Sequence, residues 1–450
     1  MTETLERPFS TKGLAAFRMA FGALMFVSVC RFAWYGWIDE FFVKPQFFFK
    51  YWGFSWVVPF GRTGMHVAFV ALGALSVLVA VGAFYRASIT LFFLLFTYVQ
   101  LIDVTNYLNH YYLTSLLALL LCFTPAHARW SVDAWRNPNV QRDTLPAIYT
   151  YLLRFQVAAV YFYAGLAKFN TDWLLHGEPM TIWLNARTHL PVLGPLFRLQ
   201  WMPVFMSWAG FLFDTGIPFL MMATRTRPFA YVAIVIFHVV THLAFPIGMF
   251  PAIMVTSALI FFSPKWPDVF LRRIVRTHPH TDSSSQRGVR VPQWAIALSM
   301  VYVSAQVLIP LRHRFYGDNV SWHEQGMRWS WKVMLHEKNG SVHYRVVDAS
   351  TGRTWHVSPH KYLTERQLRD FSTQPDLVLQ LAHHIANSFR ARGVDDVHVY
   401  VDALVSLNGR PAARLIDPNI DLLTLRDGIR TATWILLSPQ SPPPALRPVS

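Results

Sequence analysis

The residue with the clearest capacity for chemistry is a lysine at the end of an apolar run. Lys168 closes the run YLLRFQVAAVYFYAGLAK and is followed at once by FNTDWL. A lysine at the rim of a membrane helix is either an anchor that reaches the interface or a base held where water is scarce. Spacing alone favours the anchor. A base would make the chain an enzyme that removes a proton from a compound dissolved in the membrane.

The helix that must position Lys168 carries a polar stripe. Arg154, Ala158, Tyr161, Gly165 and Lys168 share one helix face by their spacing. Lipid would not tolerate an arginine at that depth, so the face must contact protein or a water-filled cavity.

A second intramembrane charge is Asp214, within GFLFDTGIPFLMM. Buried acids in membranes are costly and are either paired or functional. An ion pair with Arg154 that holds the bundle together is one interpretation of both residues, and a direct role for Asp214 is another.

Histidines add proton-handling capacity. His238 and His242 are spaced as HxxxH on one helix face, but no further ligand motif accompanies them, so we expect a cavity-lining pair and no metal. Asn109 and His110 lie between two apolar runs on the same predicted side as Lys168, where a neutral histidine and a lysine could share one site.

Aromatic and sulfur side chains gather in MRWSWKVMLHEKNG, a segment beyond the apolar runs. Such a cluster is typical of a domain core, and equally of a surface that docks on the membrane bundle. Its members are Trp329, Trp331, Met334 and His336.

Composition places the chain in a membrane. Hydrophobic residues make up 53% and charged residues 14% of 450, whereas soluble domains carry about 25% charged residues. The net charge of +15 comes from arginines in short connections between apolar runs. This is the pattern of membrane orientation, so we expect no nucleic-acid partner. Two cysteines exclude a disulfide scaffold.

Apolar runs of nearly 20 residues predict about nine transmembrane helices. Loop charge predicts a cytoplasmic N-terminus, with Lys168, His110 and the C-terminal residues on the extracytoplasmic side. A polar linker is expected at 277–292. The predicted spans are 12–34, 66–85, 87–102, 111–126, 146–168, 203–222, 228–245, 249–263 and 293–311.

We therefore predict a polytopic α-helical membrane domain at 1–312 and an extracytoplasmic α+β module rich in β-hairpins at 313–450. Asn339-Gly340 predicts one hairpin turn, Thr351-Gly352 precedes another extended run, and NGRP after VHVYVDALVSL predicts a further hairpin. Residues 364–393 read as one amphipathic helix.

These residues resemble the vitamin K-dependent γ-carboxylase family, including bacterial members with a horizontally transferred transmembrane (HTTM) domain. The resemblance extends over nearly the whole chain in the family's order. It rests on NHYYL, RWSVDAW, LRFQVAAVYFYAGLAKFNTDW, FHVVTHLAFPIGMF, FFSPKWP, RWSWKVMLHEKNGSVHYRV, DASTGRTWHVSP and VSLNGRPAARLIDPNIDL.

The resemblance implies vitamin K hydroquinone or a related quinol, oxygen and carbon dioxide as co-substrates. It makes Lys168, with Asp172 and Trp173 in its motif, the base that deprotonates the hydroquinone. The oxygenated product then takes a γ-proton from a protein glutamate, which captures carbon dioxide, and the quinone leaves as its epoxide. His110 falls on a functional histidine of the family, and the segment from Trp329 to His336 on its glutamate-binding stretch.

We expect Asn109, Tyr161, Arg154 and His238 to bind the quinol, and Trp329, Trp331, Met334 and His336 to bind a glutamate-containing protein or peptide. Loop charge places the active site outside the cytoplasm, and the resemblance to bacterial members favours a bacterial inner membrane.

The chain departs from animal members of the family around the base. Ala167 replaces a second lysine, Asn170 replaces an aspartate, and Met327 replaces a tyrosine of the glutamate-binding stretch. Quinol epoxidation alone could survive these changes. Two other classes stay open, namely a membrane protein that binds a quinol or another lipid without carboxylating, and an assembly factor whose outer module binds a partner. Neither of these needs a base at position 168.

Overall fold

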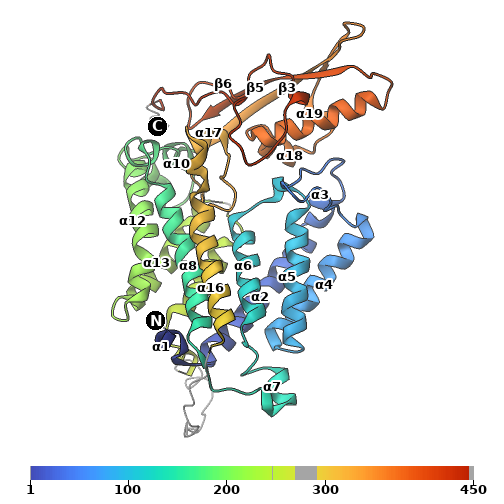
Figure 1. Cartoon of the computed structure of the whole chain (residues 1–450). Coiled ribbons are helices and arrows are strands. Elements are labelled where there is room, and N and C mark those ends of the chain that lie inside the picture. The colour runs from blue at the N-terminus through green and yellow to red at the C-terminus, as the bar shows by residue number, and fades with distance from the viewer. Residues whose placement is uncertain (1, 246, 269–290, 445–450) are drawn as a thin grey trace.

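The protein is a helical bundle with an α+β module across one end (Figure 1). The computed structural model describes residues 2–245, 247–268 and 291–444. The N-terminal helix α1 (Thr2–Glu6) lies at the end of the bundle that faces away from the module. Most of the linker predicted at 277–292 lies outside the described residues.

Every apolar run predicted to span the membrane forms a helix in the described part of the chain. Short helices and one small antiparallel pair, β1 (Pro8–Ser10) with β2 (Thr144–Pro146), connect the long helices. The long helices are α2 (Lys12–Trp34), α4 (Gly61–Val81), α5 (Tyr85–Leu101), α6 (Asn109–Phe123), α8 (Ile148–Ala167), α12 (Met202–Met222), α13 (Arg227–Ala244), α14 (Phe250–Ala258) and α16 (Gln293–Leu308). The short ones are α3 (Trp37–Phe42), η1 (Val104–Asn106), α7 (Val132–Arg136), η2 (Pro138–Val140), α9 (Thr171–Leu174), α10 (Met180–Asn185), α11 (Gly194–Phe197), η3 (Leu259–Phe261) and η4 (Ile309–Tyr316).

Length and composition support membrane crossing for fewer helices than the sequence predicts. Among the described residues, five helices are long and apolar enough, namely α2, α4, α12, α13, and α16 continued through η4. The helices α5 and α6, and α14 with η3, are apolar but shorter. The protein is therefore an integral membrane protein, whereas nine spans are not confirmed.

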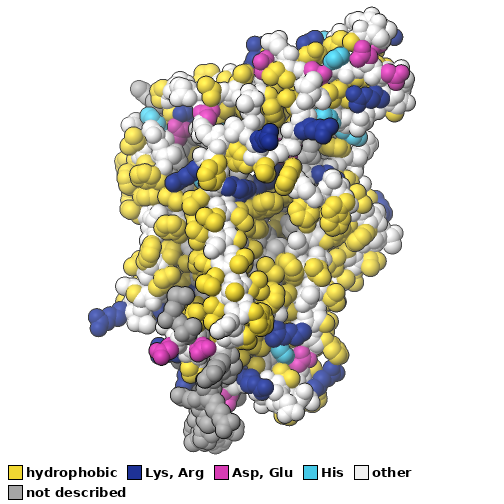
Figure 2. All heavy atoms as spheres, in the orientation of Figure 1, with side chains coloured by type: hydrophobic (Ala, Val, Ile, Leu, Met, Phe, Trp, Pro, Cys, Tyr) yellow, Lys and Arg dark blue, Asp and Glu magenta, His cyan; other side chains and the backbone are white. Residues whose placement is uncertain are grey.

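The side-chain surface agrees with a membrane setting. Apolar side chains cover the flank of the bundle, while lysines and arginines gather towards its two ends (Figure 2). Exposed Val70, Phe229, Val232, Val301 and Leu308 belong to this apolar flank. A flank of this kind is stable in lipid and would be an aggregation hazard in water.

The module contains a four-stranded antiparallel sheet with strand order β4-β3-β5-β6. Alternate side chains of β5 are buried, and the amphipathic α19 contributes a second row of buried residues to the same core. The elements are α17 (Val320–His323), β3 (Lys338–Asp348), β4 (Thr354–Val357), η5 (Pro359–Lys361), α18 (Glu365–Phe371), α19 (Pro375–Arg390), β5 (Val397–Leu407), β6 (Ala413–Arg414) and η6 (Leu422–Thr424).

One predicted hairpin is wrong. Asn339 and Gly340 lie inside β3, which runs without a turn and pairs with β5 along its whole length. Gly340 serves close packing instead, because a Cβ there would lie 2.5 Å from the carbonyl oxygen of Ser372. The turn at Thr351-Gly352 does join two antiparallel strands, and the NGRP turn joins β5 to β6. The single helix predicted at 364–393 is two helices, α18 and α19.

Bundle loops enter the core of the module and fix it in place. Phe49, Tyr51 and Val104 pack in the same hydrophobic cluster as the strands of the sheet. The Gln367 side chain donates 2.8 Å hydrogen bonds to the Phe47 carbonyl and to Asp103 Oδ2. The module is thus built partly on the bundle.

Candidate functional site

Lys168 lies at the C-terminal cap of α8 and forms a buried ion pair with Asp214 of α12. Its Nζ is 2.8 Å from Asp214 Oδ2 and donates a second hydrogen bond, of 3.1 Å, to the Ala164 carbonyl. Both side chains are only 8% exposed. The ion pair of Asp214 with Arg154, one of the interpretations from the sequence, is therefore wrong, because Asp214 pairs with Lys168.

Gly165 sets the height at which α12 crosses α8. A Cβ at this position would lie 2.5 Å from Thr215 Cγ2 and 2.7 Å from the Thr215 backbone nitrogen. Only glycine allows the two helices to approach this closely. Thr215 follows Asp214, so the same close approach brings the Asp214 carboxylate beside the end of α8.

The remaining residues of the AGLAKFNTDW motif cover the lysine and tie it to the module. The Trp173 ring centroid is 5.3 Å from Lys168 Nζ, and the Trp173 indole nitrogen donates to the Ser207 carbonyl at 2.8 Å. Asp172 accepts two 2.7 Å hydrogen bonds from the guanidinium of Arg410, in the β5–β6 turn. An ion pair therefore attaches the module to the bundle at Asp172, four residues after Lys168.

The ion pair forms part of the wall of an apolar cavity, which we call the lysine cavity. Tyr161 and His238 line the same space, and the Tyr161 hydroxyl is 2.9 Å from His238 Nε2. His238 is buried, and its Nδ1 has no hydrogen-bond partner among the described residues. A buried polar atom without a partner is costly, so it marks a place where a ligand group could bind.

The lysine cavity is narrow, at about 100 Å³, whereas typical ligand pockets measure roughly 300–1,000 Å³. Four methionines line it, and their unbranched side chains can adopt other rotamers to widen it. They are Met180, Met206, Met254 and Met334.

Asn109 and His110 lie in a second, larger space of about 350 Å³, which we call the histidine cavity. Phe250 and Met334 line both cavities. The Phe250 ring centroid is 6.0 Å from that of His110 and 5.6 Å from that of His238. The structure thus places His110 and Lys168 in adjoining spaces that share a wall, and not in one space.

The segment that supplies Met334 has an unusual backbone. Trp329, Trp331 and Met334 have φ values of 62°, 56° and 46°, in the left-handed region that non-glycine residues rarely adopt. Each such residue costs on the order of 1–3 kcal/mol, and strain of this kind concentrates at functional sites. Tertiary packing must hold the segment in this shape.

The four residues predicted to bind a substrate do not converge. Met334 reaches both cavities, whereas Trp331 is fully buried and stacks on Tyr112 with centroids 4.8 Å apart. Trp329 stacks on Tyr51 with centroids 5.8 Å apart, facing another pocket of the module. Burial, reinforced by Lys338 and Lys332, lowers the pKa of His336 to about 3, so His336 is neutral, and it lines neither cavity.

Arg154 lies away from both cavities, nearer the opposite end of α8. Its guanidinium donates to the carbonyls of Ile260 and Phe262 at 2.8 and 3.0 Å, and it lies over the rings of Phe9 and Tyr151. These contacts join α8 to the end of α14 and η3. The structure does not bring Arg154 to the candidate quinol site.

Sequence reasoning missed Phe250, which separates the two cavities, and Glu178, which is buried just beyond α9. Burial raises the pKa of the Glu178 carboxyl to about 7, with the negative charge of Asp172 adding to the effect. No motif in the sequence singles out either residue. A phenylalanine in an apolar run resembles the other phenylalanines, and Glu178 lies in the short connection between α9 and α10.

Two family models match consecutive parts of the chain. The HTTM domain matches residues 6–266, and the lumenal domain of vitamin K-dependent gamma-carboxylase matches residues 291–441. The chain belongs to the vitamin K-dependent gamma-carboxylase family. No solved structure matches it.

Membership of this family implies the use of vitamin K hydroquinone, oxygen and carbon dioxide, and the residues present fit a hydroquinone. The lysine cavity offers apolar walls for a ring and, at its polar end, Lys168, Tyr161 and the unpartnered Nδ1 of His238 for hydroxyl groups. Within the described residues, no group of three or more His, Cys, Asp or Glu side chains gathers as metal ligands would.

Proposed function

We propose that the chain is a γ-glutamyl carboxylase-like enzyme that binds a hydroquinone in the lysine cavity and uses Lys168 as its base. It would couple hydroquinone epoxidation by oxygen to carboxylation of a glutamate in a protein or peptide. The observation that carries this proposal is the buried Lys168–Asp214 pair in the wall of an apolar cavity. A structural anchor would direct its ammonium towards the interface and would need no cavity.

Lys168 must be neutral to accept a proton, and Asp214 is the group that makes this possible. Their atoms are 2.8 Å apart, so a proton can pass from the amine to the carboxylate along an existing hydrogen bond. The neutral amine then accepts a proton from the hydroquinone hydroxyl. Trp173 closes the space on one side and keeps water away from the pair.

Tyr161 and His238 would orient the ring. The Tyr161 hydroxyl and His238 Nε2 satisfy each other, which leaves the His238 Nδ1 to bind a hydroxyl of the hydroquinone. When bound, the hydroquinone reacts with oxygen and supplies the strong base that removes the glutamate γ-proton. Holding the ring against Lys168 in a dry cavity is the part played by the chain.

We assign the histidine cavity to the glutamate side chain. Phe250 and Met334 line both cavities, so a glutamate held beside Asn109 and His110 would lie one side chain away from the hydroquinone. Arg31 and Arg366 also line the histidine cavity, and their positive charges would attract a carboxylate. Trp329, Trp331 and His336 would shape the segment that carries Met334 without touching the substrate.

The loop charges support an orientation with the N-terminus in the cytoplasm and with Lys168 and the module outside it. A bacterial inner membrane is the setting that we propose. Because Met334, from the part of the chain that follows the bundle, lines both cavities, both lie at the end of the bundle that carries the module. A protein substrate would therefore approach from the module side.

Reconstituting the pure protein tests the proposal. Vitamin K hydroquinone, oxygen, labelled carbonate and a glutamyl peptide are supplied, and epoxide formation and incorporation of the label are measured separately. We expect both products from the native chain and neither from Lys168→Met. Equal epoxide formation by the native chain and Lys168→Met would refute the role of the base.

The second candidate function is a quinol epoxidase or a quinol-binding protein without carboxylase activity. The departures at Ala167, Asn170 and Met327 favour it, because they lie beside the base and in the stretch matched to glutamate binding. Epoxide without label would assign an epoxidase. Hydroquinone binding with no product would assign a binding protein.

A further inference from the structure

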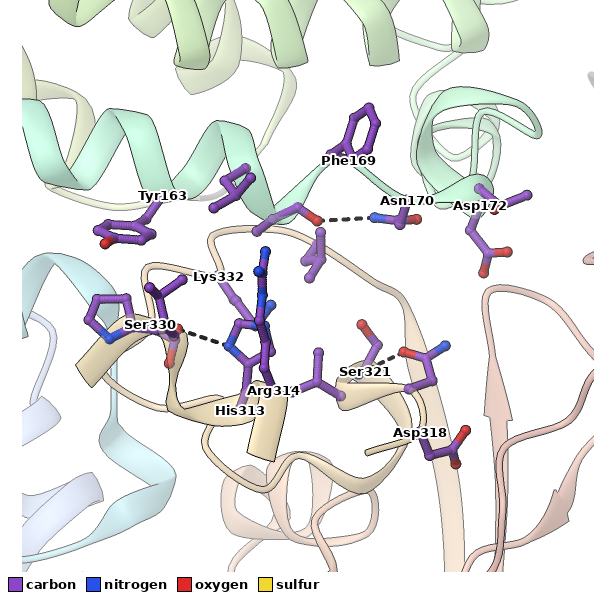
Figure 3. Close-up of a pocket in the computed structure, with 18 of the residues that line it drawn as sticks. Tyr163, Phe169, Asn170, Asp172, His313, Arg314, Asp318, Ser321, Ser330 and Lys332 are labelled. Atoms are coloured by element: carbon purple, nitrogen blue, oxygen red, sulfur yellow. Dashed lines mark hydrogen bonds between the residues drawn. The ribbon is translucent and has the colours of Figure 1, made fainter. Parts of the chain in front are cut away.

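A third space, separate from both cavities, lies where the end of α8 meets η4 and the module. It measures about 550 Å³ and is shown in Figure 3. Tyr163, Asn170 and Asp172 line it from the bundle side, and His313, Arg314 and Lys332 from the opposite side. We call it the basic pocket. Lys168 does not line it.

Two cationic side chains, Arg314 and Lys332, meet the neutral imidazole of His313 in this pocket without an acid to neutralise them. Lys332 is only 8% exposed, and its Nζ has no hydrogen-bond or ion-pair partner among the described residues. Arg314 lies near enough to add to burial in lowering the pKa of Lys332 to about 8. The amine therefore still carries its proton at neutral pH. His313 uses Nδ1 to bind the Pro310 carbonyl at 2.8 Å, which leaves Nε2 available.

The two carboxylates in the wall are already committed to other partners. Asp172 holds Arg410 and Asn408, with the Asn408 amide 2.8 Å from its Oδ2. Asp318 accepts two 2.7 Å hydrogen bonds from the backbone and hydroxyl of Ser438. In Figure 3 both aspartates lie away from the basic group, at the other side of the pocket. The basic end of the pocket thus lacks an anion.

The surroundings of the pocket indicate where such an anion would come from. Phe169 lines the opening and is 69% exposed, and Phe315 beside Arg314 is 84% exposed. Leu308, the last residue of the largely exposed α16, is 65% exposed. These apolar side chains belong in lipid, and a row of lysines and arginines lies just above the apolar flank in Figure 2. The pocket therefore lies where the apolar flank of the bundle gives way to charged side chains, as the boundary between membrane and water would require.

We propose that the basic pocket binds the phosphate of an anionic membrane lipid from the leaflet on the module side, with Lys332, Arg314 and His313 as its ligands. Charge-assisted hydrogen bonds from an arginine and a lysine are the usual means of holding a phosphate. The acyl chains would lie along Phe169, Leu308 and the exposed side of α16. The bound lipid would join the end of α8 to the module. This inference does not depend on the chemistry at Lys168.

Native mass spectrometry of the full chain tests the proposal. The protein is exchanged into detergent with either phosphatidylglycerol or phosphatidylcholine of identical acyl chains, and the retained lipid is counted. We expect preferential retention of phosphatidylglycerol. Lys332→Met should weaken it at least about tenfold, the loss expected when one charged hydrogen bond is removed. Lys332→Arg should restore most of it.

Lys361→Met is the matched control, because Lys361 is an exposed lysine of the module away from the pocket. Arg314→Gln is a second variant in which the change is at an exposed side chain, so it should fold even if Lys332→Met does not. Equal retention by the native chain, Arg314→Gln and Lys361→Met would overturn the proposal.

Competition distinguishes the possible sources of the anion. Inorganic phosphate at millimolar concentration should not displace phosphatidylglycerol, because it lacks the acyl chains. Displacement by phosphate would assign a soluble anion, and displacement by a glutamyl peptide would assign the pocket to the substrate. Either result would reject the lipid.

Discussion

Removing one partner of the Lys168–Asp214 pair should destabilise the bundle much more than removing both. In Asp214→Asn the ammonium of Lys168 stays 8% exposed and loses its counter-ion. Breaking a buried pair in this way costs about 3–5 kcal/mol, because an uncompensated charge is left in a low-dielectric site. Lys168→Met leaves the Asp214 carboxylate in the same position, so its cost should be similar.

The double variant Lys168→Met/Asp214→Asn removes both charges and keeps similar side-chain volumes. Its cost should fall to about 0–2 kcal/mol, since replacing a buried pair by neutral groups is often nearly neutral. The coupling free energy between the two positions should therefore be about 4 kcal/mol or more.

Unfolding in mixed micelles, followed by tryptophan fluorescence during titration with a denaturing detergent, measures these free energies. Asp395→Asn serves as the control, because Asp395 is exposed on the module. Additive costs in the double variant would show that the two side chains do not interact, and the argument for a shared proton would fail with them. Epoxide formation measured on the same samples separates folding from catalysis, because the double variant should be stable and inactive.

Three further predictions concern the surroundings of the base. Burial raises the pKa of Glu178 from 4.5 to about 7, so its contribution to stability is complete below about pH 4.5 and is lost as the pH rises through 7. The free energy of unfolding should therefore change less between pH 6 and pH 8 in Glu178→Gln than in the native chain. Arg410→Met leaves Asp172 without its bidentate partner and should cost about 3 kcal/mol of stability. Limited proteolysis between the module and the bundle should become faster, and an unchanged cleavage rate would count against this docking role. Met334→Ala opens the wall between the two cavities and should raise the ratio of epoxide to carboxylated peptide; an unchanged ratio would show that Met334 does not separate them.

Local rules predicted most of the helices and failed where long-range packing made the choice. An apolar run of about 20 residues has few alternatives to a helix in a membrane, so all the predicted runs are helical in the described part of the chain. Asn339-Gly340 has the composition of a hairpin turn, yet β3 continues through it. Position 340 must be glycine because a side chain there would clash with Ser372. Ser372 is distant in the sequence, so the residues next to Gly340 do not reveal this contact.

The sequence by itself determined the membrane class, the family and the inward-facing stripe that ends at Lys168. Only the tertiary structure decided which residue Asp214 pairs with. Arg154 and Lys168 lie on the same stripe, 14 positions apart, so helix periodicity permits either partner. The choice depends on the height at which α12 crosses α8, and that height is set by the contact between Gly165 and Thr215. Likewise, the ring of Phe250 packs between His110 and His238 and puts Lys168 and His110 in adjoining cavities. This packing joins side chains of three helices, so no pattern along a single helix could predict it.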